Sequence, residues 1–173
     1  MYTLHWNNDL NTGIIEIDGQ HRRIMDLINR LQRLARQERG LTHQGEAMLA
    51  PLFPEVGADR AQIQAAIEDL VDYSLSHFSF EESLMEKAGH PATYDHRKAH
   101  QAFRRHVIEV LGLFEAGEDV LDSLIRLLCQ WFFKHIAHDD QELSGIDRDG
   151  LHPGVANAEF MMSPHLLFKD VAA

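Results

Sequence analysis

Four stretches of this chain repeat apolar residues at helical spacing, and each repeat is interrupted by histidine or an acidic residue where leucine or isoleucine would normally lie. A charged carboxylate that is buried without a partner is strongly destabilising, and a buried imidazole needs partners for its ring nitrogens. Several such groups at one level of a helical bundle indicate a metal site. The chain must therefore fold so that these polar groups meet one another.

Glycine, proline and capping residues separate the four stretches. Asp18 is the expected N-cap of the first helix. Asp59 precedes the second helix and forms, with Gln62, an acidic variant of the capping box. The predicted helices cover about residues 19–38, 60–88, 91–117 and 119–143.

Short connections between successive helices favour antiparallel neighbours. We therefore predict an all-α fold, an up-down-up-down antiparallel four-helix bundle, over residues 1–145. Segment 39–58 is broken by glycine and proline and is interpreted as an insertion that extends the first connection. Residues 146–173 show no clear periodicity and are interpreted as a C-terminal tail.

Charge and hydropathy exclude two classes of partner. The formal net charge of −11, with no basic cluster to offset it, argues against nucleic acid and anionic membrane surfaces. No apolar run approaches the roughly 18 residues of a membrane-spanning helix, and the first residues lack the features of a secretory signal. We expect a cytoplasmic protein. Cys129, the single cysteine, cannot form an internal disulfide and is expected to be a small core residue.

Two pairs of candidate metal ligands lie on the second and third predicted helices. His77 and Glu81 are four residues apart, as are His96 and His100, so each pair projects from one helix face. A hairpin between Glu81 and His96 returns the third helix beside the second at about the same height. Each pair can bind one ion or bridge two.

The first and fourth helices supply the remaining candidates. His21 lies early on the first helix, while His135 and Asp140 lie late on the fourth. In an up-down-up-down bundle these positions fall near the same end as the two pairs. Imidazole and carboxylate suit iron, but they also suit manganese, zinc and copper, so the donor type alone does not identify the metal.

These residues and their spacings resemble the hemerythrins, specifically the bacterial single-domain members. The resemblance covers about residues 6–143. It is carried by Trp6, Thr12-Gly13-Ile14, Ile17-Asp18, Gln20-His21, His77-Phe78, Glu81-Glu82, Met85, His96, His100, Trp131, His135-Ile136 and Asp140.

The resemblance implies two iron ions per chain, bridged by Glu81, by Asp140 and by an oxo or hydroxo group. One iron would be saturated by three histidines, and the other would keep an open position where dioxygen binds. The implied ligands are His96, His100 and His135 for the first iron, and His21 and His77 for the second.

An apolar pocket at the open position is also implied, lined by Ile24, Phe78, Trp131, Phe132 and Ile136. Such a lining limits the access of water to an oxidisable centre. Phe132 replaces the leucine that is common at its position in the family, which would narrow the pocket.

Asp140 follows His135 by five residues, which on a regular helix turns the two side chains about 140° apart. Asp139, four residues on, fits a regular helix better. The family spacing is five, and a local widening of the helix would supply the difference. We therefore predict Asp140 as the ligand. Glu82 is expected to be a solvated surface residue.

The leading functional prediction is reversible dioxygen binding by a carrier, store or sensor. The alternative is a di-iron redox enzyme that reduces nitric oxide, peroxide or dioxygen with electrons from a donor protein or a small reductant. A third hypothesis, iron storage, requires far more than two ions per chain. The histidine-rich ligand set argues against ferritin-like oxidases, which use mostly glutamates. Fewer carboxylates also stabilise high-valent iron less, which favours reversible binding.

Overall fold

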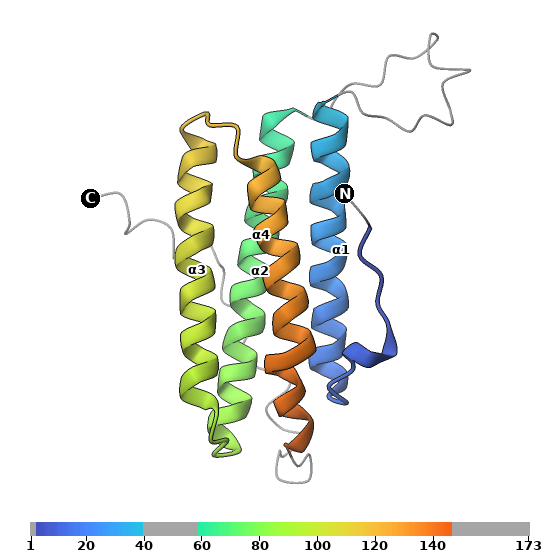
Figure 1. Ribbon diagram of the computed structural model, residues 1–173, viewed down its shortest axis with the longest axis vertical. Coiled ribbons are helices and arrows are strands. Elements are labelled where there is room, and N and C mark those ends of the chain that lie inside the picture. The colour runs from blue at the N-terminus through green and yellow to red at the C-terminus, as the bar shows by residue number, and fades with distance from the viewer. Residues whose placement is uncertain (1–2, 40–58, 147–173) are drawn as a thin grey trace, which may run out of the picture.

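The computed structural model describes residues 3–39 and 59–146, and all regular elements in these ranges are helical. Figure 1 shows four long helices that run alternately up and down, which confirms the predicted all-α antiparallel bundle. They are α1 (Ile15–Glu38), α2 (Arg60–Lys87), α3 (Thr93–Glu115) and α4 (Leu121–Lys134). Three short elements complete the fold: the 3-10 helix η1 (Asn8–Leu10), the π-helix η2 (His135–Asp139) and the 3-10 helix η3 (Asp140–Gly145).

The capping box predicted for α2 is present. The Asp59 carboxylate accepts the backbone N–H of Gln62 at 2.7 Å, and the Gln62 side chain accepts the N–H of Asp59 at 3.3 Å. These bonds satisfy two donors that the first helical turn cannot pair internally. The start of α2 is therefore fixed by local chemistry.

Asp18 does not cap α1, so that prediction was wrong. The helix begins four residues earlier than expected, at Ile15, and Asp18 lies within its first turns. Its carboxylate accepts the backbone N–H and the hydroxyl of Thr12, at 2.8 and 2.9 Å. This buried contact ties the preceding chain to the part of α1 that carries His21.

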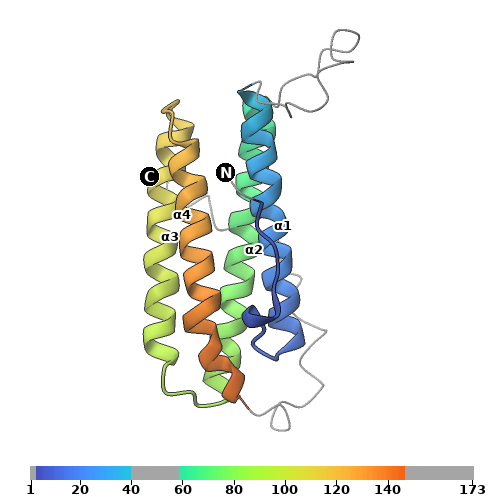
Figure 2. The ribbon, with the colours of Figure 1, turned by 45° about the vertical axis from the view of Figure 1, so that its right-hand side comes forward.

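The amino-terminal segment runs along α1 (Figure 2). The Asn29 side chain holds it there, because its oxygen accepts the N–H of Leu4 at 2.8 Å and its amide donates to the Leu4 carbonyl at 2.9 Å. Trp6 then lies with its ring 6.2 Å from the ring of His21. The segment therefore covers one side of α1 at the level of the polar residues.

The apolar stripes pack into a core that fills most of the bundle. Burying a leucine or isoleucine side chain stabilises the fold by about 1.5–3 kcal/mol, so this core supplies the main driving force. In α3, Leu111 lies in the core, whereas its neighbour Val110 is only half-buried. The residues with no more than 1% exposure include Ile24, Ile28, Leu31, Ile63, Ile67, Leu70, Phe114, Leu124 and Ile125.

A second, smaller apolar cluster closes the lower end of the bundle in Figure 1. It gathers the start of α1, the end of α2 and the end of η3. The predicted polar residues lie between this cluster and the large core, so apolar side chains pack above and below them. The small cluster consists of Ile14, Ile17, Leu84, Met85, Leu143 and Ile146.

Among residues 3–39 and 59–146, no helix is long and apolar enough to cross a membrane. The predicted insertion at 39–58 and the predicted tail at 146–173 lie outside the described residues, apart from Arg39 and Ile146. Cys129 is half-buried against the core, and its sulfur accepts the side-chain N–H of Gln32 at 3.2 Å.

Candidate metal centre

The chain widens where α4 passes into η2. The N–H of Asp140 donates to the carbonyl of His135, five residues earlier, instead of to the residue four earlier. One extra residue in this turn rotates Asp140 back to the face that His135 occupies. The predicted widening is therefore present. The side chain of Asp140 is fully buried, whereas that of Asp139 is 39% exposed.

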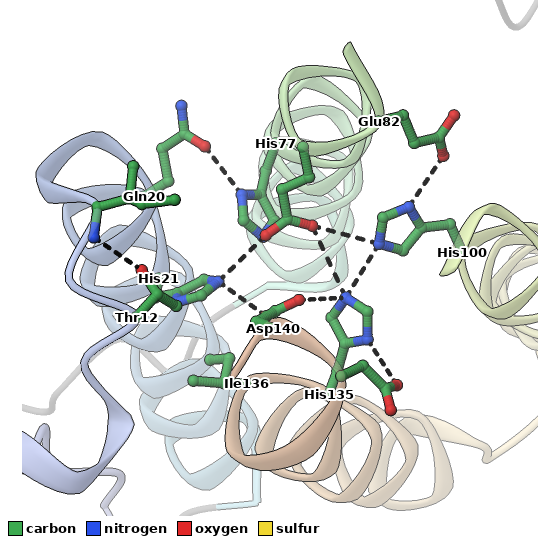
Figure 3. Close-up of polar contacts among 12 residues, drawn as sticks. Thr12, Gln20, His21, His77, Glu82, His100, His135, Ile136 and Asp140 are labelled. Carbon is green, nitrogen blue, oxygen red and sulfur yellow. Dashed lines mark hydrogen bonds and ion pairs between the residues drawn. The ribbon is translucent and has the colours of Figure 1, made fainter. Parts of the chain in front are cut away.

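All seven predicted ligands lie together inside the bundle, and none is more than 4% exposed. Figure 3 labels five of them: His21, His77, His100, His135 and Asp140. All four long helices or the turns that follow them contribute. His21 comes from α1, His77 and Glu81 from α2, His96 and His100 from α3, and His135 and Asp140 from η2 and η3, which follow α4. Their potential ligand atoms form two groups in which every atom lies within 4.8 Å of the others. The groups are Glu81, His96, His100 and His135, here the three-histidine cluster, and His21, His77, Glu81 and Asp140, here the two-histidine cluster.

Glu81 faces both clusters, one with each carboxylate oxygen. Its Oε1 atom lies 3.5 Å from Nε2 of His21 and 3.2 Å from Nε2 of His77. Its Oε2 atom lies 3.4 Å from Nε2 of His96 and 3.3 Å from Nε2 of His100. This carboxylate can therefore bind one ion in each cluster.

Asp140 repeats this arrangement from the opposite side. Its Oδ2 atom lies 3.0 Å from Nε2 of His21, in the two-histidine cluster. Its Oδ1 atom lies 3.1 Å from Nε2 of His135 and 3.5 Å from Nε2 of His96. Two carboxylates thus span the same pair of positions, which is the geometry of a bridged pair of metal ions.

Several buried polar atoms at the centre have no hydrogen-bond partner among the described residues: Nε2 of His21 and His77, Oε1 of Glu81 and both carboxylate oxygens of Asp140. Leaving such atoms unpaired is costly unless something else binds them. The Nε2 atoms of His100 and His135 lie 2.9 Å apart. Adjacent ligands of an octahedral ion with bonds of about 2.1 Å are separated by about 3.0 Å. The side chains present therefore fit metal ions.

Three polar residues hold three of the five candidate ligand imidazoles from outside. With Nε2 directed inward, each Nδ1–H donates to an oxygen: His77 to Gln20 at 2.8 Å, His100 to Glu82 at 2.9 Å and His135 to Asp139 at 2.9 Å. These bonds fix ring orientation and tautomer. For the two-histidine cluster, Figure 3 shows Gln20 reaching His77 from α1.

The prediction that Glu82 is a solvated surface residue was wrong. One oxygen binds His100 and the other accepts Nε–H of Arg97 at 3.0 Å, leaving the side chain 23% exposed. Glu82 directly follows Glu81, so it points about 100° away from the centre on α2. Its contact depends on the neighbouring α3, which local sequence patterns do not report.

The predicted pocket residues surround the centre, but not all on one side. Phe132 stacks toward His77, with ring centroids 6.3 Å apart. Phe78 contacts both clusters, because its ring stacks on His100 at 3.9 Å and lies 5.7 Å from the ring of His77. Trp131 stacks on His135 at 4.3 Å and covers the three-histidine cluster. Ile136 lies beside Asp140 and His21 in Figure 3. Ile24, three residues after His21 on α1, is fully buried in the large core.

The other seven histidines of the chain lie outside the centre wherever the structure describes them. His5, His106 and His138 are exposed, and the half-buried His90 accepts the N–H of Ala92 on its ring. His43, His152 and His165 lie outside the described residues.

Burial lowers the pKa of the imidazoles, whereas the neighbouring carboxylates raise it. Burial lowers the pKa of His77 to about 3, so this ring is neutral and its Nε2 lone pair is free at neutral pH. Burial also opposes protonation of His135, but the carboxylates of Asp140, Asp139 and Glu81 outweigh it and raise its pKa to about 10. Surrounding imidazoles hold the pKa of Glu81 well below its usual range despite burial.

Metal loading at pH 7 is expected to release at least one proton per chain. His135 is protonated in the metal-free protein because its pKa is about 10, and a metal ion must displace this proton from Nε2. Apparent affinity should therefore fall as the pH falls. The raised pKa of His135 also stabilises the metal-free fold. This stabilisation is fully present below pH about 6.5 and is lost as the pH rises through 10. Titration calorimetry in buffers of different ionisation enthalpy measures the number of protons released. Metal binding without proton release would contradict this prediction.

Comparison with known proteins gives consistent results. The model of the hemerythrin HHE cation binding domain matches residues 12–146. The bacteriohemerythrin of Pseudomonas aeruginosa is 45% identical over 140 residues, which are 81% of this chain and 78% of the relative. That of Stenotrophomonas maltophilia is 39% identical over 141 residues, 82% of this chain and 79% of the relative. A hemerythrin-like protein of Naegleria gruberi is 25% identical over 142 residues, 82% of this chain and 92% of the relative.

The family model spans most of the chain, including every residue of both clusters, and two relatives share well over a third of their aligned residues with it. The four-helix bundle and its buried histidine and carboxylate groups agree with that match. The resemblance inferred from the sequence is thus confirmed, and the chain belongs to the hemerythrin family.

Proposed function

We propose that this protein binds dioxygen reversibly at a pair of iron ions held by His21, His77, Glu81, His96, His100, His135 and Asp140. The observation that carries the proposal is the sharing of Glu81 and Asp140 between the two clusters, one oxygen facing each. When bound, a pair of ferrous ions supplies the two electrons that dioxygen accepts.

The numbers of donors make the two positions unequal. The three-histidine cluster offers three imidazoles and an oxygen from each shared carboxylate, so a shared solvent-derived oxygen completes six ligands. The two-histidine cluster offers His21, His77 and the same two carboxylates, which with that oxygen makes five. An octahedral ion held by these residues would keep one position for a small ligand.

The chain's own residues restrict what reaches that position. His21 and His77 are no more than 1% exposed, and the aromatic ring of Phe132 faces His77. Ile24 and Ile136 are also buried on this side. An apolar surrounding admits a small neutral molecule such as dioxygen and limits water and larger substrates. Phe78 lies against both His77 and His100, whereas Trp131 packs against the other cluster, where it shields His135.

Reduced, iron-loaded protein exposed to air is expected to develop a visible charge-transfer band that disappears when oxygen is removed. The buried centre and its five-donor position favour a reversible complex over net oxidation. Spectra recorded through repeated cycles of air and argon, with metal analysis of the same sample, measure this. Direct oxidation without a reversible species would instead favour the alternative of a redox enzyme, and uptake far beyond two ions would favour storage.

The division into a bundle over 1–145 and a tail over 146–173, the cytoplasmic location and a reducing partner are proposals from the sequence.

A further inference from the structure

The imidazoles of the two clusters have chemically different partners on their outer ring nitrogens. In the three-histidine cluster, His100 and His135 each donate to a carboxylate, that of Glu82 and that of Asp139. In the two-histidine cluster, His77 donates to Gln20, a neutral amide. The buried Nδ1 of His21 has no hydrogen-bond partner among the described residues.

A carboxylate partner raises the electron density on the metal-facing nitrogen of an imidazole more than an amide partner does. A hydrogen bond to an anion is roughly twice as strong as one between neutral groups, and it pushes electron density toward the opposite ring nitrogen. The effect is large here because His100 and His135 are almost completely buried, where electrostatic interactions are weakly screened. Their Nε2 atoms are therefore stronger donors than those of His77 and His21.

Glu82 is held in position for this role. Arg97, one turn before His100 on α3, donates Nε–H to its second oxygen at 3.0 Å and also binds Glu86. The contact fixes the Glu82 carboxylate between α2 and α3 with its other oxygen 2.9 Å from Nδ1 of His100. Glu86 touches Arg97 and lies one turn further along α2, beyond the reach of the histidine.

We propose that Glu82 is a positioning residue that increases the inequality of the two halves of the centre beyond the difference in donor number, so that the three-histidine cluster binds its metal ion first and more tightly. This inference rests on the proposed two-ion centre. The effect of Glu82 is exerted through His100, and Asp139 acts in the same direction through His135.

Exchanging the two kinds of partner tests the inference. Glu82→Gln puts an amide oxygen opposite His100 and removes the charge with little change in shape. Gln20→Glu does the reverse opposite His77. Glu86→Gln removes a charge from the same helix, and from the same arginine, without touching a histidine, which makes it the matched control.

Co²⁺ is titrated anaerobically into metal-free protein and followed by calorimetry and visible absorption, so that stepwise affinity is read without oxygen chemistry. For the unmodified protein we expect two steps. Glu82→Gln should lower the Co²⁺ affinity of the first step about 10- to 100-fold and leave the affinity of the second step unchanged. Gln20→Glu should tighten the second, and Glu86→Gln should change neither.

Two results overturn the inference: two ions taken up by the unmodified protein with one affinity, or an equal effect of Glu82→Gln on both steps, which is what a merely structural role predicts. Uptake of fewer than two Co²⁺ ions by the unmodified protein is a different failure, because it contradicts the proposed two-ion centre itself.

Discussion

Removal of metal is expected to lower the melting temperature of this protein by roughly 15–30 °C. Without ions, the bundle buries two carboxylates and five imidazoles. Inward-facing atoms of His21, His77, Glu81 and Asp140 have no hydrogen-bond partner among the described residues. An ion that binds only the folded state at 1,000 times its dissociation constant adds about 4 kcal/mol, so two ions add about 8 kcal/mol. In a chain of this size each kcal/mol shifts the melting temperature by about 2–4 °C.

The measurement compares thermal melting followed by circular dichroism before chelation, after chelation and after anaerobic return of Fe²⁺. Glu81→Gln is the control, since it removes the charge of a carboxylate shared by both clusters and should make melting nearly insensitive to Fe²⁺. Equal melting temperatures with and without metal would show that the ions bind elsewhere or only weakly.

Asp140→Asn is expected to reduce the iron content from two ions per chain to one or none, whereas Asp139→Asn should keep two. The side chain of Asp140 is fully buried with one oxygen toward each cluster, and an asparagine amide cannot bind an ion on both sides. Asp139 lies outside, where it accepts Nδ1–H of His135, and asparagine keeps an accepting oxygen there.

Metal analysis after anaerobic loading and desalting measures both variants, with circular dichroism of the metal-free forms to confirm that the helices are retained. The reverse outcome, loss of iron in Asp139→Asn alone, would mean that the widened turn at η2 does not direct Asp140 inward.

The elements that local chemistry specifies could be predicted from the sequence. The capping box of Asp59 and Gln62 needs only neighbours three residues apart, and it starts α2 where expected. That the candidate ligands gather could also be predicted, since the spacing of His77 and Glu81 puts both on one face of a helix. The five-residue step from His135 to Asp140 required a widened turn, and the chain has one.

The parts that escaped prediction depend on contacts between distant segments. Asp18 looks like an N-cap in the sequence, but its partner is Thr12, in a chain segment that folds back over α1. Glu82 looks solvated, but α3 brings His100 and Arg97 to its two oxygens. Periodicity reports which side of a helix is apolar and does not report which neighbour meets its polar side.

The most direct test is a crystal structure of the iron-loaded protein with anomalous scattering measured at the iron edge. Two iron peaks are expected inside the bundle, each bound by one oxygen of Glu81 and one of Asp140, with three histidines on one ion and two on the other. A single peak, or iron bound away from these seven residues, would contradict the paired centre.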